Sequence, residues 1–294
     1  MTAGDFPCPV CGAEAHRAYL PDTIGDRPVV FGYKWDERVR EHYRFVRCRP
    51  CRHVWASPRP GNIYAHYTSV ADPGYLANAA LRRATARRVL DTLRRHAPSG
   101  RLLDIGCGTG DFLDEARGHY EVEGLELAVW AAEIARAKGL RVHERLVAEM
   151  PADGPGYQVA TLWGVIEHFE HPLEEMRRIN RLLAPDGLVA LWTGDVDSVE
   201  SRLLRDRWWY VMGQHMHLFS RASLAKLMKL AGFAPLHRGV YPYVISFDYL
   251  GTRLQPVLGP LAKSIFHRPS LRERTISLYL PGEIFDVWRK IRNV

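Results

Sequence analysis

An acid and a run of glycines near the middle of the chain have the spacing of a ligand-binding turn. Asp104 is followed by glycines at alternate positions, Gly106, Gly108 and Gly110. Glycine tolerates positive φ angles and lets a ligand approach the backbone closely, so this run predicts a cradle. Its spacing differs from the G-x-G-x-x-G of dinucleotide folds. A carboxylate beside the turn suits a cationic or hydroxyl-rich ligand better than a pyrophosphate.

The elements around the turn place a second acid next to it. Residues 101–105 are short and aliphatic, which is typical of a buried strand, and the pattern after Gly110 is helical. A second strand over 120–125 ends at Glu126, which is 126 − 104 = 22 residues after Asp104. In open α/β sheets, ligands lie across the carboxyl ends of neighbouring strands, and an acid at the second tip binds ribose hydroxyls. We therefore expect both acids at one nucleoside site.

These motifs, together with a third block, resemble the class I S-adenosylmethionine-dependent methyltransferases. The third block is similar to the E-H-x(3)-P and L-x-P-x-G pattern of the branch that methylates small molecules, sugars and quinones. The resemblance covers roughly residues 80 to 240 and implies a Rossmann-like seven-stranded α/β sheet flanked by helices. The last strand, 284–289, is expected to be antiparallel and inserted beside the sixth. The blocks that carry the resemblance are Asp104-x-Gly106-x-Gly108-x-Gly110, Gly124-Leu125-Glu126, Glu167-His168 with Pro172, and Leu182-Leu183-Ala184-Pro185-Asp186-Gly187.

The resemblance implies S-adenosylmethionine as the cofactor. Tyr67 or Tyr75, which precede the first core helix, are candidates to cover the adenosine or the acceptor. In a related quinone-methylating branch, a glutamate at the position of Gly164 joins the following Glu-His to hold a divalent metal. Gly164 lacks that ligand, so metal-assisted catalysis is not predicted. The residues expected to bind the cofactor are Asp104, Gly106, Cys107, Gly108, Gly110, Glu126, Leu127, Glu149 and Trp163.

Three histidines are candidate general bases, because a neutral imidazole accepts a proton from a substrate hydroxyl or amine. His168 follows the fourth strand, whose tip faces the methyl group in this fold. His215 and His217 lie in the long segment 193–219, and on an extended backbone their side chains would point the same way, which suits a base or metal pair. The alternative is that these histidines orient loops through hydrogen bonds. The same segment is rich in tryptophan and arginine, which suit a ring and an anionic group of the acceptor.

Two C-x-x-C pairs predict a structural zinc site near the N-terminus. Cys8 and Cys11 form the first pair, and Cys48 and Cys51 form the second. Two thiolates on one turn suit tetrahedral zinc, and four thiolates leave no open position for water. The 36 residues between the pairs exceed the roughly 15–20 of usual zinc ribbons. We therefore expect a zinc-ribbon-like module whose insert, residues 25–43, forms a long hairpin or flap.

Composition and pattern suggest four regions. We expect a zinc-binding module over 1–60, a linker and cap helix over 61–98, the cofactor-binding core over 99–242, and an extension over 243–294. No run of about 18 apolar residues and no signal peptide are apparent, which favours a cytoplasmic protein. The apolar part of the extension, 243–268, is a candidate for peripheral membrane contact, a homodimer contact or a wall of the acceptor pocket.

The acceptor class follows less directly from the residues. We expect O-methylation of a small-molecule or carrier-linked acceptor, such as a glycan, a lipid-linked sugar or a secondary metabolite. The net charge of +7 and the arginines interleaved with aromatics over 38–59 leave nucleic acid as a second partner class, and hence an RNA methyltransferase as an alternative. A third reading is a non-catalytic zinc- and cofactor-binding partner subunit.

Overall fold

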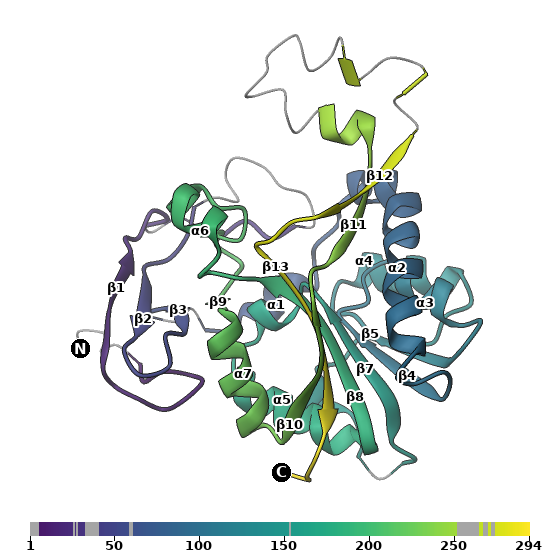
Figure 1. The fold of residues 1–294 in the computed structure, drawn as a ribbon, viewed down its shortest axis with the longest axis horizontal. Helices are drawn as coiled ribbons and strands as arrows, with labels where there is room; N and C mark the ends of the chain where they lie inside the picture. The colour runs from purple at the N-terminus through teal and green to yellow at the C-terminus, as the bar shows by residue number, and fades with distance from the viewer. Residues whose placement is uncertain are drawn as a thin grey trace.

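A mixed seven-stranded sheet forms the centre of the molecule, with helices on both faces (Figure 1). The structure, a computed structural model, describes residues 6–25, 27, 29–32, 41–58, 61–152, 154–251, 265–266, 270–271 and 274–294. Its central strands are β4 (Arg101–Ile105), β5 (Glu121–Leu125), β6 (Val142–His143), β7 (Tyr157–Trp163), β8 (Leu183–Gly194), β10 (Phe233–Gly239) and β13 (Glu283–Lys290). The order is β10-β13-β8-β7-β4-β5-β6. β13 runs antiparallel between β8 and β10, whereas β4 to β8 pair in parallel, which confirms the predicted Rossmann-like fold.

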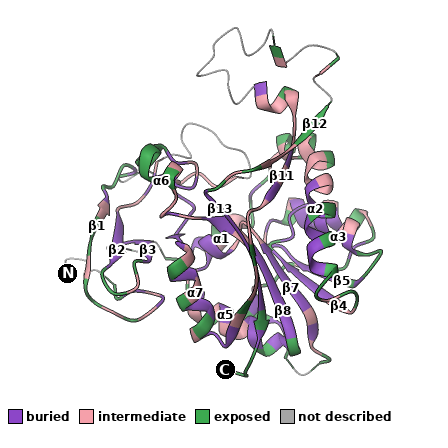
Figure 2. Cartoon of the chain, viewed as in Figure 1, coloured by how far each residue is buried: buried purple, intermediate pink, exposed green. Residues whose placement is uncertain are grey.

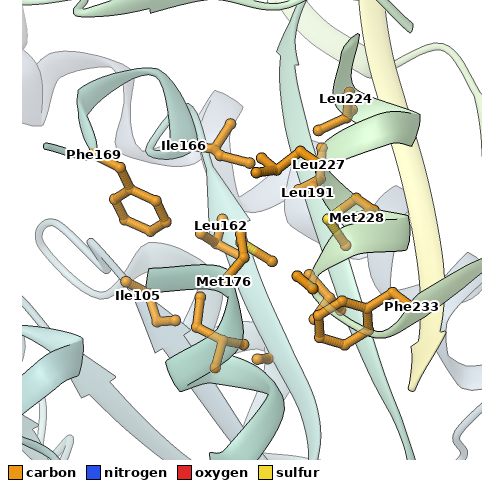
Figure 3. Close-up of a cluster of buried hydrophobic side chains, with 14 of the residues drawn as sticks. Ile105, Leu162, Ile166, Phe169, Met176, Leu191, Leu224, Leu227, Met228 and Phe233 are labelled. Carbon is orange, nitrogen blue, oxygen red and sulfur yellow. The ribbon is translucent and has the colours of Figure 1, made fainter. Parts of the chain in front are cut away.

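Two hydrophobic clusters fill the space between the sheet and its helices. Alternate residues of a strand point to opposite faces: Leu102 packs with the cluster under α2, α3 and α4, whereas Leu103 packs with the cluster under α5 and α7. Figure 3 shows the second cluster, in which Leu162 and Leu191 of the sheet meet Leu227 of α7. The central strands are largely buried (Figure 2). The helices are α2 (Ala79–Arg94), α3 (Asp111–Ala116), α4 (Val129–Ala137), α5 (Pro172–Leu182) and α7 (Arg221–Leu230).

The N-terminal strands form a second, antiparallel sheet beside the core. β1 (His16–Leu20), β2 (Phe45–Cys48) and β3 (Val54–Ala56) are joined by β9 (His217–Leu218), in the order β1-β2-β3-β9. β9 belongs to the segment that follows β8, so this sheet contains chain from both the N-terminal region and the core. Part of the insert expected to form a hairpin or flap, residues 33–40, lies outside the described residues.

Short elements complete the fold. β11 (Pro242–Ser246) and β12 (Thr275–Tyr279) pair antiparallel beside α2, whereas residues 252–264 and 267–269 of the apolar segment 243–268 lie outside the described residues. Within the described ranges, no helix is long and apolar enough to cross a membrane. The remaining turns and helices are α1 (Ile63–Tyr67), η2 (Pro73–Asn78), η3 (Val147–Glu149), η4 (Ile166–His168), α6 (Val199–Leu204) and η5 (Arg205–Arg207).

Candidate active site

The glycine turn lies between β4 and α3 and is tied to the tip of β5. Gly106, Gly108 and Gly110 have φ angles of +69°, +53° and +77°, which favour glycine. A Cβ on Gly106 would also come within 2.6 Å of Val165 Cγ2. The Glu126 carboxylate accepts the Gly108 N–H at 2.8 Å and the Ala128 N–H at 2.8 Å. The two cofactor motifs, which are distant in sequence, therefore form one continuous surface.

Asp104 is the second acid of this surface. It is 1% exposed, and its carboxyl accepts a hydrogen bond from the Thr161 hydroxyl at 2.6 Å. Burial raises the pKa of Asp104 to about 8, the Thr161 bond opposes this rise, and the charge of Glu126 adds to it. A carboxyl that is protonated near neutral pH can exchange hydrogen bonds with ligand hydroxyls, and a cationic ligand beside it would lower its pKa and favour its charged form.

Tyr75, on η2, covers the glycine turn. A Cβ on Gly108 would lie 3.5 Å from the Tyr75 hydroxyl. Arg82 holds Tyr75 in place, because its guanidinium lies 3.5 Å from the ring centroid and donates to the Tyr75 carbonyl at 2.6 Å. Arg82 also donates to Asp111 at 2.8 Å, at the start of α3. Arg82 thereby holds the segment before α2 in place over the glycine turn.

The remaining expected cofactor residues have different surroundings. The Glu149 carboxylate accepts the Leu146 N–H at 2.8 Å and so caps its own 3₁₀ turn. Cys107 is buried against the tip of β5, whereas Leu127 is partly exposed. Trp163 is partly exposed, and its ring centroid lies 5.1 Å from that of Phe112. Its Nε1 has no hydrogen-bond partner among the described residues.

His168 and His215 lie together at the carboxyl ends of β7 and β8. Their ring centroids are 4.6 Å apart. His168 Nδ1 lies 2.7 Å from the hydroxyl of Tyr67, the other predicted cover residue, and 2.9 Å from the Gln214 carbonyl. The carbonyl only accepts and the hydroxyl can accept, so a proton on Nδ1 suits both partners and leaves Nε2 as the basic nitrogen. Burial lowers the pKa of His168 to about 4, although the carbonyls of Gln214 and Gly164 oppose this effect. The imidazole is therefore neutral at pH 7.

Glu167, His168 and His215 offer a carboxylate oxygen and two ring nitrogens within 4.8 Å of one another. This donor set suits a proton relay and also a divalent cation. The short motif around Gly164 did not indicate His215 as the third member, because it approaches from a segment 47 residues after His168 (215 − 168). His217 points elsewhere, since it contacts the Phe169 carbonyl at 2.9 Å. The two histidines therefore do not form the expected pair.

An aromatic cluster lies beside these histidines. Trp192, on β8, stacks on Tyr241 at 4.6 Å between ring centroids and 19° between planes. Glu283, at the start of β13, is 0% exposed and accepts three hydrogen bonds from this cluster. The donors are Trp192 Nε1 at 2.6 Å, Trp209 Nε1 at 3.1 Å and the Tyr210 hydroxyl at 2.6 Å. Sequence reasoning missed Glu283, because only the insertion of β13 beside β8 brings it to this site.

The four N-terminal cysteines form a compact cluster. Cys8 Sγ lies 3.5 Å from Cys51 Sγ, Cys11 Sγ lies 3.6 Å from Cys48 Sγ, and all four sulfurs lie within 4.8 Å of one another. None of them forms a disulfide. Tetrahedral zinc with Zn–S bonds of about 2.3 Å separates its sulfurs by about 3.8 Å, so the cluster fits this ion.

The fold and the paired acids define the class of protein: this chain is a class I S-adenosylmethionine-dependent methyltransferase. A family model described as a methyltransferase domain matches residues 77–238, more than half of the 294-residue chain. The chain belongs to this family.

Sequence relatives include methyltransferases of different kinds. The chain is 33% identical over 105 residues to the ubiquinone biosynthesis O-methyltransferase of Xanthomonas campestris, which covers 33% of this chain and 44% of that one. It is 30% identical over 108 residues to the "Probable tRNA methyltransferase 9B" of Bos taurus, which covers 36% and 24%. An uncharacterised protein of Methanocaldococcus jannaschii is 24% identical over 50% of this chain and 68% of its own length. The chain thus spans less than half of the two relatives with a named activity.

Solved structures share the fold. The methyltransferase in a complex with the Trm112 methyltransferase activator from Haloferax volcanii has a TM-score of 0.55 at 16% identity, covering 80% of this chain and 100% of that one. A SAM-dependent methyltransferase from Archaeoglobus fulgidus has a TM-score of 0.52 at 17% identity, covering 74% and 100%.

Proposed function

We propose that this enzyme methylates an oxygen of a small-molecule or carrier-linked acceptor, such as a glycan or a secondary metabolite, with His168 as the general base. The observation that carries this proposal is that a neutral imidazole and a stacked Trp192–Tyr241 pair belong to one cluster. The His215 ring lies against His168 and 5.7 Å from the ring of Tyr210, which in turn lies 6.3 Å from that of Trp192. The imidazole and the stacked pair both lie at the carboxyl ends of β7 and β8, next to the glycine turn. A base and a flat apolar wall are the groups that a hydroxyl on a compact acceptor requires.

The cofactor half of the site comprises the glycine turn and its two acids. Glu126 would bind the ribose hydroxyls, since its carboxylate is already fixed by the Gly108 and Ala128 amides. Asp104 would face the cationic part of the cofactor, and Tyr75 would cover it. When bound, S-adenosylmethionine supplies an activated methyl group on its sulfonium. The protein then has to align the acceptor with this group and exclude water.

The acceptor half has to remove one proton. His168 Nε2 would take the proton of the acceptor hydroxyl, because the Gln214 carbonyl holds the other proton on Nδ1. His215 lies against the His168 ring, and Glu167 lies beside both. Burial raises the pKa of Glu167 to about 8, so this carboxyl gains the negative charge that would stabilise an imidazolium only as the pH approaches that value. Glu283 would hold Trp192, Trp209 and Tyr210 as a rigid wall.

The four cysteines would bind one structural zinc ion. Their sulfur separations suit this ion, and four thiolates leave it no open coordination position. The two turns are built for a knuckle, because the Gly12 and Arg52 amides donate to the Cys8 and Cys48 carbonyls at 2.8 and 3.1 Å.

The test combines a screen with a matched pair of variants. Cell extracts and glycan or phenol libraries are incubated with a methyl-labelled cofactor, and the product that gains the label is identified by mass spectrometry. His168→Ala should lower its turnover by about 10²- to 10⁴-fold without weakening cofactor binding. His119→Ala, at an exposed histidine after α3, is the control. A labelled RNA, or full activity of His168→Ala, would refute the proposal.

A tRNA is the second candidate acceptor, supported by the bovine relative and by three exposed arginines, Arg202, Arg205 and Arg207, near the N-terminal sheet. Salt-sensitive tRNA binding that is lost in an Arg202→Ala, Arg205→Ala, Arg207→Ala variant would favour it. The non-catalytic alternative predicts that the protein binds the cofactor but labels neither a small-molecule acceptor nor an RNA.

A further inference from the structure

The N-terminal sheet continues directly into the acceptor half of the site. β9 pairs antiparallel with β3, with Val54 opposite Leu218 and Trp55 opposite His217. The Ala56 amide extends the pairing by donating to the Met216 carbonyl at 2.9 Å. The edge of the cysteine module and the segment that carries His215 thus form one sheet.

The other edge of the same segment is hydrogen-bonded to the residue that precedes the candidate base. The Met216 amide donates to the Glu167 carbonyl at 2.8 Å. Met216 therefore links β3 on one side to η4 on the other, and its neighbour His215 packs against His168. A strand of two residues has few bonds of its own, so its position depends on these two edges.

A buried histidine pair bridges the same gap through side chains. His53 and His217 are both 0% exposed, and His53 Nε2 lies 3.1 Å from His217 Nδ1. Because His217 Nε2 must donate to the Phe169 carbonyl, its Nδ1 accepts, and His53 Nε2 is the donor. The His53 carbonyl in turn accepts the Cys48 amide at 2.8 Å. Hydrogen bonds thus run from a cysteine turn to the residue after His168.

The hydrogen bonds that fix the glycine turn of the cofactor half have partners of another kind. The amides of Gly106 and Cys107 donate to the Leu125 carbonyl at 2.8 and 2.9 Å, and the Gly108 amide donates to Glu126. These bonds lie entirely within the core sheet and its loops. Hydrophobic packing does not separate the two halves, because Cys8, Val10 and Trp55 share one cluster with Phe169 and Phe219 and also with Ile105 and Leu125. The difference between the halves therefore lies in the hydrogen bonds.

We propose that metal binding by the four cysteines positions the acceptor half of the active site, with His53 as the positioning residue that transmits it. This inference rests on the proposed zinc site and on the proposed role of His168. Loss of the metal should release the edge formed by β3, free Met216 and His215, and leave the cofactor half intact. On this proposal the cysteine module forms part of the acceptor site, and the acceptor half is ordered only when the metal is bound.

The first experiment compares the full chain with and without zinc, using readouts that need no acceptor. Zinc content is measured by atomic emission, amide hydrogen exchange by mass spectrometry, and S-adenosylmethionine binding by calorimetry. We expect one zinc per chain. Chelation should speed exchange of the Met216 and Ala56 amides at least about tenfold, while exchange at 104–110 and cofactor affinity stay within about threefold.

The second experiment tests His53 with zinc still bound. His53→Leu removes the donor and should speed exchange at Met216, whereas His53→Gln restores an N–H donor and should return exchange toward the wild-type rate. Arg17→Ala, on the exposed face of β1, is the matched control. Once an acceptor is known, His53→Leu should lower kcat and leave the KM for the cofactor unchanged.

Three outcomes would overturn the proposal. They are the absence of bound zinc, unchanged exchange at Met216 after chelation, and equal loss of order in both halves of the site together with loss of cofactor binding. Failure of the proposed function is separable, because an RNA product or an active His168→Ala variant would leave these exchange and binding results in place.

Discussion

Replacement of Asp104 by asparagine should change how the stability of the protein depends on pH. Asp104 is 1% exposed, and its pKa of about 8 lies well above the ordinary value of 3.8. Between these pH values the folded protein binds a proton that the unfolded chain does not. The stabilisation is therefore complete below about pH 4 and is lost as the pH rises through about 8. Asparagine does not titrate, and its side-chain oxygen still accepts the Thr161 hydroxyl.

The size of the effect follows from the pKa displacement. A pKa raised from 3.8 to about 8 corresponds to at most about 6 kcal/mol, with a slope of at most about 1.4 kcal/mol per pH unit. Solvent that enters beside the partly exposed Tyr75 lowers this figure. We expect the stability of Asp104→Asn relative to wild type to improve by at least about 2 kcal/mol between pH 5 and pH 8.

Urea denaturation of both proteins at several pH values measures this difference. Other carboxyl groups with raised pKa values, such as Glu167, contribute equally to both proteins, so the comparison with wild type removes their contribution. This holds because the free-energy changes at distant sites are additive. Asp91→Asn, at an exposed position on α2, is the control and should show no trend. A difference between Asp104→Asn and wild type that is constant from pH 5 to pH 8 would show that Asp104 is not a protonated buried acid.

Three further predictions test the same description of the site. Gly106→Ala should weaken cofactor binding more than about tenfold in calorimetry, because φ is +69° and the new Cβ would meet Val165 at 2.6 Å; unchanged affinity would contradict the close approach. Glu283→Leu should lower the free energy of unfolding by about 3 kcal/mol or more, since three buried donors lose their acceptor. A loss below about 1 kcal/mol in urea denaturation would show that Glu283 does not hold the aromatic wall together. Activity of the enzyme should show no titration of His168 between pH 6 and pH 8, because its pKa is about 4; a change in kcat/KM that disappears in His168→Ala would contradict this.

The core could be predicted from the sequence because its signals are local. The strand expected over 101–105 agrees with β4 at both ends, since a short aliphatic run is bounded there by turns. The glycines of the turn indicated positive φ angles, and these are observed. The cap helix expected within 61–98 is α2, and the 3₁₀ turn η2 precedes it, because Pro73 and Gly74 start a tighter turn there.

The acceptor half depends on contacts that no local pattern encodes. β9 has two residues and exists only through its pairing with β3, so nothing in residues 215–218 predicted a strand. For the same reason, His217 was grouped with His215, whereas its partner is His53, 164 residues away. Glu283 precedes a predicted strand and carries no motif, and its three aromatic donors come from β8 and the segment after it.

Calorimetric titration of S-adenosylmethionine into the wild-type chain and into Glu126→Ala tests the central claim most directly. That claim is that Glu126 and the glycine turn hold the nucleoside of the cofactor, since the carboxylate is fixed by the Gly108 amide at 2.8 Å. Glu133→Ala, on the exposed side of α4, serves as the control. We predict saturable binding to the wild type and the control, and an affinity about 10- to 100-fold lower for Glu126→Ala in a protein that remains folded. Equal affinity of wild type and Glu126→Ala would contradict the account.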